Sequence, residues 1–135
     1  MSKTKKKSKS KNQFNIVQFL LHLLISVKLY HWITGSYATH EATDKLYTSL
    51  NLQIDMFIEV MLGKGFSKEN LNVKEVKFKK YSIKQFLSYI NRCKKTLINL
   101  PTICKEVSNN DTDILNIRDE ILSSLNQLTY LLSFS

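Results

Sequence analysis

The 135-residue chain contains few of the residues that break or turn a polypeptide, with three Gly and one Pro. A β-rich domain needs many turns, so this scarcity excludes a fold built from many short strands. Long segments with apolar residues at helical spacing dominate instead. The sequence therefore predicts an all-α protein, and its length and 43% hydrophobic content predict one folded domain.

Cysteine is also scarce, because Cys93 and Cys104 are the only two. They are three helical turns apart on one predicted helix, which is too far for a disulfide within that helix. Neither has a Cys or His neighbour at the spacing of a zinc site. We expect two reduced thiols in the core.

Long hydrophobic runs are missing as well. Polar and charged residues interrupt the most apolar segment at Gln18, His22, Ser26 and Lys28. An uninterrupted run of about 18 apolar residues is the usual mark of a membrane helix, and no signal-peptide pattern is present. We expect a soluble, intracellular protein of the cytoplasm or nucleoid, with a nucleus or virion as alternatives and no membrane partner.

Four segments have the periodicity of amphipathic helices, at residues 14–33, 40–62, 82–99 and 112–132. Asn15 is placed to cap the first, and Asp111 or Thr112 the fourth. The linker from Gly63 to Lys80 is predicted to be too short and too basic for another helix. Four helices of similar length predict an antiparallel four-helix bundle with one longer connection.

The apolar positions of these segments define the predicted buried faces. They are Phe14, Val17, Leu20, Leu21, Leu24, Val27 and Leu29; Leu46, Leu50, Ile54, Phe57, Ile58 and Met61; Ile83, Phe86, Leu87, Ile90, Leu97 and Ile98; and Ile114, Ile117, Ile121, Leu125, Leu128 and Leu132. Trp32 is predicted to pack in the core, whereas His22 is predicted to be an interface or surface histidine.

Five potential metal ligands lie on the first two helical segments, which a short turn at Gly35 separates: His31, His40, Asp44, Asp55 and Glu59. Asp44 and Asp55 fall within about 20° of each other around the helix but about 16 Å apart along it. Ligand atoms lie about 2 Å from a transition metal. One chain therefore cannot bring both carboxylates to one ion.

A second copy of the chain removes this difficulty. If the two long helices pack antiparallel across a two-fold axis near Ser49 and Leu50, His40 and Asp44 of one chain come opposite Asp55 and Glu59 of the other. His31 reaches the same place through the turn. Mixed imidazole and carboxylate donors suit iron, with zinc or manganese as alternatives. The sequence predicts a homodimer with two identical metal sites.

The residues around these ligands resemble the Dps-like miniferritins of the ferritin-like superfamily, over roughly residues 14–63. The shared pattern is His31-Trp32 at the end of the first helix, the turn Thr34-Gly35, His40 with Asp44 four residues later, and Asp55-Met-Phe-Ile-Glu59. The Glu-x-x-His motif of ordinary di-iron ferritins is absent. The resemblance implies a ferritin-like bundle, an inter-subunit di-iron ferroxidase centre that oxidises Fe(II), and assembly beyond a dimer into a shell.

The basic residues are concentrated at the N-terminus. The formal charge is +9, and the six lysines of residues 1–13 account for all but +3 of it; they are Lys3, Lys5, Lys6, Lys7, Lys9 and Lys11. Such a segment cannot fold alone, so we expect a disordered tail followed by a bundle at residues 14–135. The tail suits nonspecific contacts with nucleic-acid phosphates, as in several miniferritins. A solubilising or targeting tail is the alternative.

Two other functions fit the same residues. One is a structural or nucleic-acid-packaging protein on a ferritin-like scaffold without redox chemistry, which the basic tail and the few acidic residues outside the site favour. The other is a helical adaptor whose polar stripe is only an interface. Iron binding followed by oxidation separates the ferroxidase from both.

Overall fold

The computed structural model describes residues 13–134, and every regular element within this range is helical. The predicted all-α class is confirmed for these residues. The elements are α1 (Ile16–Ile33), α2 (Tyr37–Gly63), the 3-10 turn η1 (Lys68–Leu71), α3 (Ile83–Ile98), the short α4 (Leu100–Ile103) and α5 (Thr112–Leu132). The predicted tail lies outside the described residues, except for Gln13.

Local hydrogen bonds explain where the helices begin. The Asn15 side chain accepts from the Gln18 amide at 3.0 Å, as predicted for the start of α1. Ser82 and Gln85 form a reciprocal capping box at α3. The prediction that the second helix begins at His40 is wrong by three residues, because the Ser36 hydroxyl caps the Thr39 amide and α2 starts at Tyr37.

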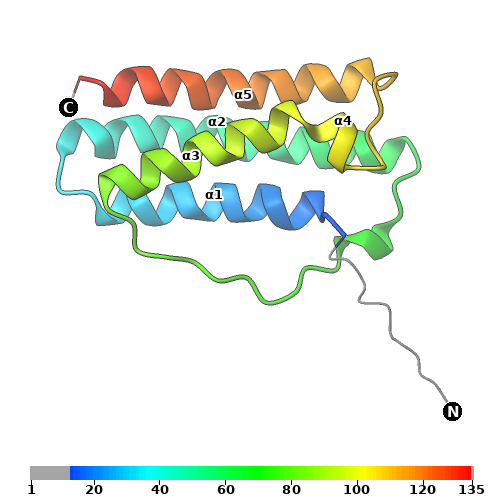
Figure 1. Cartoon of the computed structure of the whole chain (residues 1–135), viewed down its shortest axis with the longest axis horizontal. Coiled ribbons are helices and arrows are strands. Elements are labelled where there is room, and N and C mark those ends of the chain that lie inside the picture. Colours follow the sequence, from blue (N-terminus) through cyan, green and yellow to red (C-terminus); the bar gives the residue numbers. More distant parts are fainter. Residues whose placement is uncertain (1–12, 135) are drawn as a thin grey trace, which may run out of the picture.

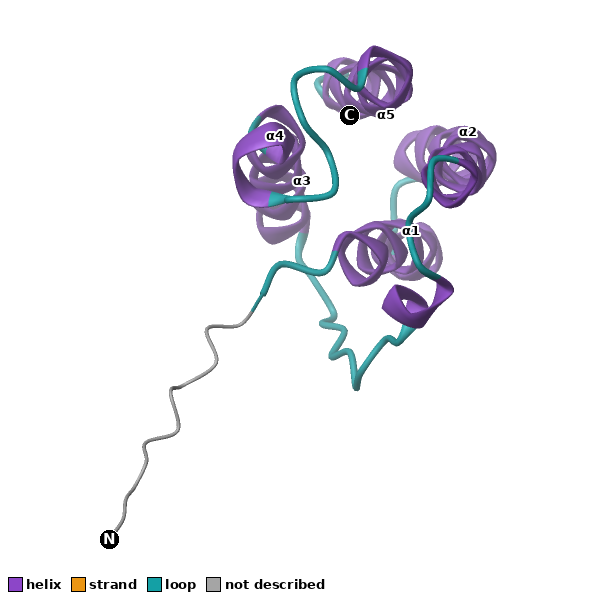
Figure 2. Ribbon diagram, turned by 90° about the vertical axis from the view of Figure 1, so that its right-hand side faces the viewer, coloured by secondary structure: helices purple, strands orange, loops and turns teal. Residues whose placement is uncertain are grey.

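The four long helices of the described chain lie side by side as a bundle (Figure 1). Figure 2 looks along the bundle and shows α1, α2, α5 and α3 in that order around the core. Each helix runs opposite to its neighbours, so α2 and α3 face each other across the core and point the same way (Figure 1). The chain must therefore travel back along the bundle between α2 and α3.

This return path occupies residues 64–82. It begins after α2, which ends where Gly65 adopts a left-handed φ of 106° that favours glycine. The expectation that it holds no helix is wrong in one detail, since η1 forms a single 3-10 turn after the capping residue Ser67. Residues 72–82, named the strap below, have no regular secondary structure and run along the outside of α1 toward α3 (Figure 1).

The core lies between the four long helices, and the predicted buried face of α5 is correct at all six positions. Three other predictions are wrong, because Leu21 is 39% exposed, Ile83 43% and Ile98 57%. One residue step of about 100° turns Leu21 away from the buried Leu20. Ile83 and Ile98 are the first and last residues of α3, so each lies at a helix end.

By length and composition, α1 is apolar enough to cross a membrane, although no such span was expected from its polar interruptions. Its mean hydropathy is 1.5 and half of its residues are buried in the bundle. Core helices and N-terminal signal sequences also have these properties. The absence of a membrane partner therefore stays a prediction.

Cys93 and Cys104 are both free and buried, as expected. Burial raises the pKa of the Cys93 thiol to about 12 and that of Cys104 to about 11. The thiolate is the reactive form, so a disulfide reagent used near the ordinary thiol pKa of about 8.5 should modify neither cysteine in the folded protein and both in denaturant. Absorbance of the released thiolate measures this, and rapid modification of a native cysteine would contradict the packing of α3 and α4.

Candidate metal centre

Two histidines meet where α1 ends and α2 begins. The connection consists of Thr34, Gly35 and Ser36, and the Thr34 hydroxyl accepts from the Ser36 amide at 3.2 Å. This tight turn brings His31, in the last turn of α1, against His40, in the first turn of α2. Their rings stack with centroids 3.8 Å apart and planes inclined by 19°.

Each histidine is held by the backbone of the other. His31 Nδ1 lies 2.8 Å from the carbonyl oxygen of His40, and His40 Nδ1 lies 2.9 Å from the carbonyl oxygen of His31. A carbonyl can only accept, so both Nδ1 atoms carry the hydrogen and donate. In the neutral rings both Nε2 atoms then keep a free lone pair. A metal-binding histidine characteristically has this arrangement, with its other ring nitrogen donating to a carbonyl.

Asp44 is the carboxylate nearest this pair. One of its oxygens lies 3.9 Å from His31 Nε2, the nitrogen whose lone pair is free. His31 is buried, whereas the Asp44 side chain is 58% exposed and can turn on its helix. Transition metals bind nitrogen and oxygen at about 2.0–2.2 Å, so one ion can link atoms about 4 Å apart. The structure therefore brings together three of the five predicted ligands: His31, His40 and Asp44.

Asp55 and Glu59 lie elsewhere on the same chain. Both are exposed on α2, and Asp55 is three helical turns beyond Asp44, or about 16 Å along the axis. Between residues 13 and 134 no group of three His, Cys, Asp or Glu side chains has the geometry to hold a metal ion. A single chain thus presents two separate sets of ligands on one face of α2.

Two residues beside the histidines were not singled out in the sequence. The buried Thr43 hydroxyl lies 3.3 Å from His31 Nδ1 and donates to the Thr39 carbonyl at 2.8 Å. Lys28 lies over the rings of Tyr47 and Trp32, at 4.4 and 5.5 Å. The spacing of Thr43, three residues after His40, could have indicated it, whereas nothing in the sequence indicated that Lys28 would cover two aromatic rings.

Two neighbouring residues were the subject of predictions with opposite outcomes. Trp32 does not pack in the core, because it is the next residue after His31, faces outward and is 66% exposed. His22 is an interface histidine, as expected, since its Nδ1 lies 2.6 Å from the Tyr89 hydroxyl of α3. The tail lysines Lys3, Lys5, Lys6, Lys7, Lys9 and Lys11 lie outside the described residues.

Fold and site together define an all-α protein of four long helices, over residues 13–134, that carries two complementary sets of metal-type ligands on α2 and at the α1–α2 turn. The chain belongs to DUF5856, a family of unknown function, whose model matches residues 31–132. The match includes all five candidate ligands. No curated protein and no solved structure shows a significant match to the chain.

Proposed function

We propose that two copies of this chain build a di-iron ferroxidase centre at their interface, of the kind implied by the miniferritin resemblance. The observation that carries this proposal is the reciprocal pair formed by His31 and His40. Each ring donates its Nδ1 hydrogen to the other's carbonyl, which leaves both Nε2 atoms as acceptors beside Asp44. Stacked histidines that were merely structural would not need both free nitrogens near a carboxylate.

The second chain supplies the missing carboxylates. His40 and Glu59 are placed symmetrically about the middle of α2, between Ser49 and Leu50, and so are Asp44 and Asp55. An antiparallel copy of α2 related by a two-fold axis at that point brings Asp55 and Glu59 to the histidines of its partner. The same axis makes two identical sites. Dimerisation would therefore complete what each chain leaves half built.

Exposed apolar side chains support a second copy as the occupant of this face. On α2, Leu52 lies between the two sets of ligands and is 67% exposed, and Met56 lies next to Asp55 and is 54% exposed. Trp32, 66% exposed, borders the histidine pair at the end of α1. Apolar residues gathered on the surface of a soluble bundle commonly mark an interface. Their position beside the ligands favours a symmetric partner.

The topology is consistent with the same proposal. A four-helix bundle with one long crossover connection is the arrangement of ferritin-like proteins. Here residues 64–82 make that crossover between α2 and α3 (Figure 1). The fold is thus proposed to be ferritin-like, although the short crossover holds only one 3-10 turn where miniferritins have a further small helix.

In the proposed reaction Fe(II) is the substrate. Two Fe(II) ions supply the two electrons that, with two protons, reduce one hydrogen peroxide to two waters, or four supply those needed by dioxygen. The neutral imidazoles of His31 and His40 donate lone pairs without adding charge, and the carboxylates of Asp44, Asp55 and Glu59 offset the greater charge of the Fe(III) product. Zinc or manganese would bind the same donors without this outcome.

Anaerobic titration with Fe(II), followed by addition of peroxide or air, tests the function. We expect binding to saturate at about two ions per chain, as a di-iron centre requires, followed by ultraviolet absorbance from Fe(III) on oxidation. Size-exclusion mass measurement separates a dimer from a larger shell. Saturable binding without oxidation would leave a metal-binding scaffold and reject the ferroxidase, while failure to bind any transition metal would reject the centre itself.

The tail has its own proposed role, the nonspecific binding of nucleic acid through its six lysines. Lysine side chains release counterions when they meet phosphates, which makes such binding strongly salt-dependent. The alternative function, a packaging protein without redox chemistry, keeps this role and loses the iron chemistry. The iron titration distinguishes the two functions.

A further inference from the structure

The fold separates the charges of the described chain into two sides. Residues 72–99, which include the strap and α3, hold eight Lys and Arg and one acidic residue, Glu75. α2 and α5 hold seven of the chain's eleven acidic residues and only two basic ones. Figure 2 shows that α3 and the strap lie on the opposite side of the bundle from α2 and α5. The bundle therefore has a basic side that does not depend on the tail.

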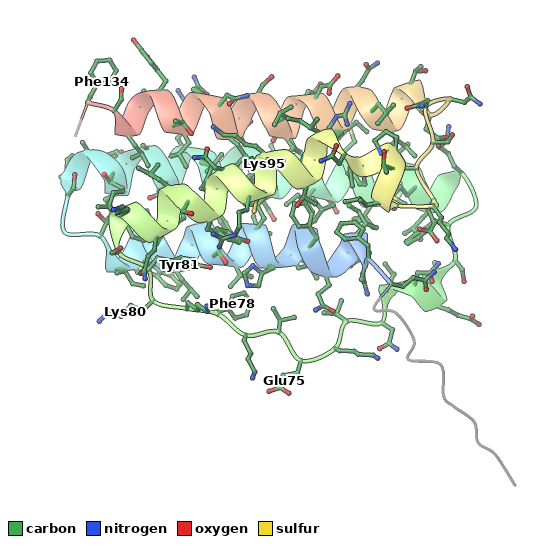
Figure 3. The ribbon with its side chains drawn as sticks, viewed as in Figure 1. Glu75, Phe78, Lys80, Tyr81, Lys95 and Phe134 are labelled. Atoms are coloured by element: carbon green, nitrogen blue, oxygen red, sulfur yellow. The ribbon has the colours of Figure 1, made fainter. Side chains whose placement is uncertain are left out.

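Seven side chains form this surface, called the basic face below: Lys74, Lys77, Lys79, Lys80, Lys84, Arg92 and Lys95. All seven are exposed. Lys94 is not included, because it turns toward α5 and donates to the Thr129 hydroxyl at 2.8 Å. In Figure 3 the labelled Lys80 points away from the bundle.

None of the seven has an acidic partner within the part of the chain that the structure describes. On the other side of the bundle, by contrast, Lys64 pairs with Asp113 at 2.9 Å and Arg118 with Asp119 at 2.7 Å. Seven uncompensated cations on one side raise the local positive potential and attract polyanions. Repulsion among them would be relieved by a partner that carries regularly spaced negative charge.

The strap holds its lysines on a defined path. The His22 Nε2 hydrogen is donated to the Lys77 carbonyl at 2.9 Å, and the Tyr89 hydroxyl is 2.6 Å from the other ring nitrogen. The Phe78 ring stacks on His22 with centroids 5.0 Å apart. The strap is thus attached to both α1 and α3 through one histidine, and Lys77, Lys79 and Lys80 flank that attachment.

We infer that the basic face binds the phosphate backbone of duplex nucleic acid without reading its sequence, as a second contact surface separate from the tail. Lys84 and Lys95 are eleven residues apart, which spans about 16 Å on a helix. A duplex presents one phosphate charge per about 1.7 Å of its axis, so roughly nine phosphates pass over that length. Ser88 and Asn91, exposed on the same side of α3, add neutral donors of the kind that contact phosphates.

Two observations favour a duplex over other polyanions. The aromatic rings of the strap are already stacked inside the protein, Phe78 on His22 and Tyr81 on Tyr89, so they are not free to stack on the bases of a single strand. The exposed side of α3 between its two ends is polar, whereas a membrane-binding helix buries an apolar face among lipids. Duplex phosphates fit this polar, cationic surface best.

The test uses the full chain with its six tail lysines changed to Gln, so that only the bundle contributes. In this background Lys79→Gln, Lys80→Gln and Lys84→Gln are combined and compared with Lys45→Gln, Lys68→Gln and Lys105→Gln, three exposed lysines outside the basic face that change the net charge equally. Fluorescence anisotropy with a short duplex of random sequence measures affinity over a range of salt concentrations. Circular dichroism confirms that both variants are folded.

We expect the basic-face variant to bind at least about tenfold more weakly. Its salt slope should fall by about 0.9 for each phosphate that no longer meets a lysine, or by between about two and three in total. The control variant should stay within about threefold of its parent, because its lysines lie away from the duplex.

Two results would overturn the inference. Equal reductions of affinity in the two variants would show that net charge alone acts. Binding of the parent to vesicles that contain an anionic phospholipid, without binding to the duplex, would assign the basic face to a membrane surface. Neither result bears on the iron centre, which uses other residues.

Discussion

Replacing Asp55 and Glu59 together by alanine should abolish Fe(II) binding while leaving a folded helical dimer. The two side chains are exposed on α2 and take no part in the hydrophobic core, so their removal should cost little stability. Removing even one supporting residue of a metal site typically lowers affinity by about 10–100-fold, so the removal of two ligands should exceed that range. Anaerobic Fe(II) titration measures binding, and circular dichroism with size exclusion measures fold and assembly.

A matched control is available on α5. Asp119→Ala with Glu120→Ala removes two exposed, adjacent carboxylates and the same charge, away from the ligands. This variant should bind iron like the unchanged protein. If Asp55→Ala with Glu59→Ala bound iron with unchanged stoichiometry, the proposed centre would be rejected.

Mixing two defective chains tests whether the site is shared between subunits. A chain with His40→Ala and Asp44→Ala retains Asp55 and Glu59, and a chain with Asp55→Ala and Glu59→Ala retains His40 and Asp44. Homodimers of either should not bind iron, whereas the mixed dimer has one complete site and one that keeps only His31. Co-expression with different tags isolates it. Recovery of half the normal stoichiometry is expected, and no recovery would rule out an inter-subunit site.

Phe86→Ala should produce the largest reduction of stability among single changes in α3. Phe86 is fully buried and its ring stacks on Tyr30 of α1, with centroids 4.3 Å apart and planes inclined by 7°. Truncating a buried Phe to Ala typically costs about 3–5 kcal/mol. A domain is stabilised by about 5–15 kcal/mol in total, so the variant should be partly unfolded or strongly destabilised. Urea unfolding followed by circular dichroism gives the difference.

Phe134→Ala is the control for this substitution. Phe134 is 70% exposed near the C-terminus, and surface changes usually alter stability by no more than about 0.5 kcal/mol. A Phe86→Ala variant as stable as Phe134→Ala would mean that α3 does not pack on α1 through this ring. The bundle would then need another arrangement of its third long helix.

Much of the fold was predictable because its signals are local. Asn15 and Ser82 cap helices through side chains that reach only three residues along the chain, so their sequence context is enough. The buried face of α5 follows from a regular apolar repeat. Predictions failed where burial depends on a neighbour, as for Leu21, Trp32 and Ile98, which are apolar but face away from the other helices or lie at a helix end.

The candidate site was only partly predictable for the same reason. Spacing placed His31, His40 and Asp44 near one another and separated Asp55 and Glu59 from them. It did not predict that each histidine would donate to the other's carbonyl, or that a threonine hydroxyl would lie against His31. These contacts depend on the angle at which α1 and α2 meet, which the short turn and the packing of both helices set together.

The sequence alone determined the all-α class, the limits of the first, third and fourth long helices to within about two residues, and the positions of the ligands along α2. These properties depend on periodicity and on neighbours within one helical turn. The tertiary structure decided the orientation of the two histidines, the exposure of the apolar residues beside them and the gathering of the strap and α3 lysines on one side. Those properties join residues that are distant in the sequence, and packing between helices brings them together.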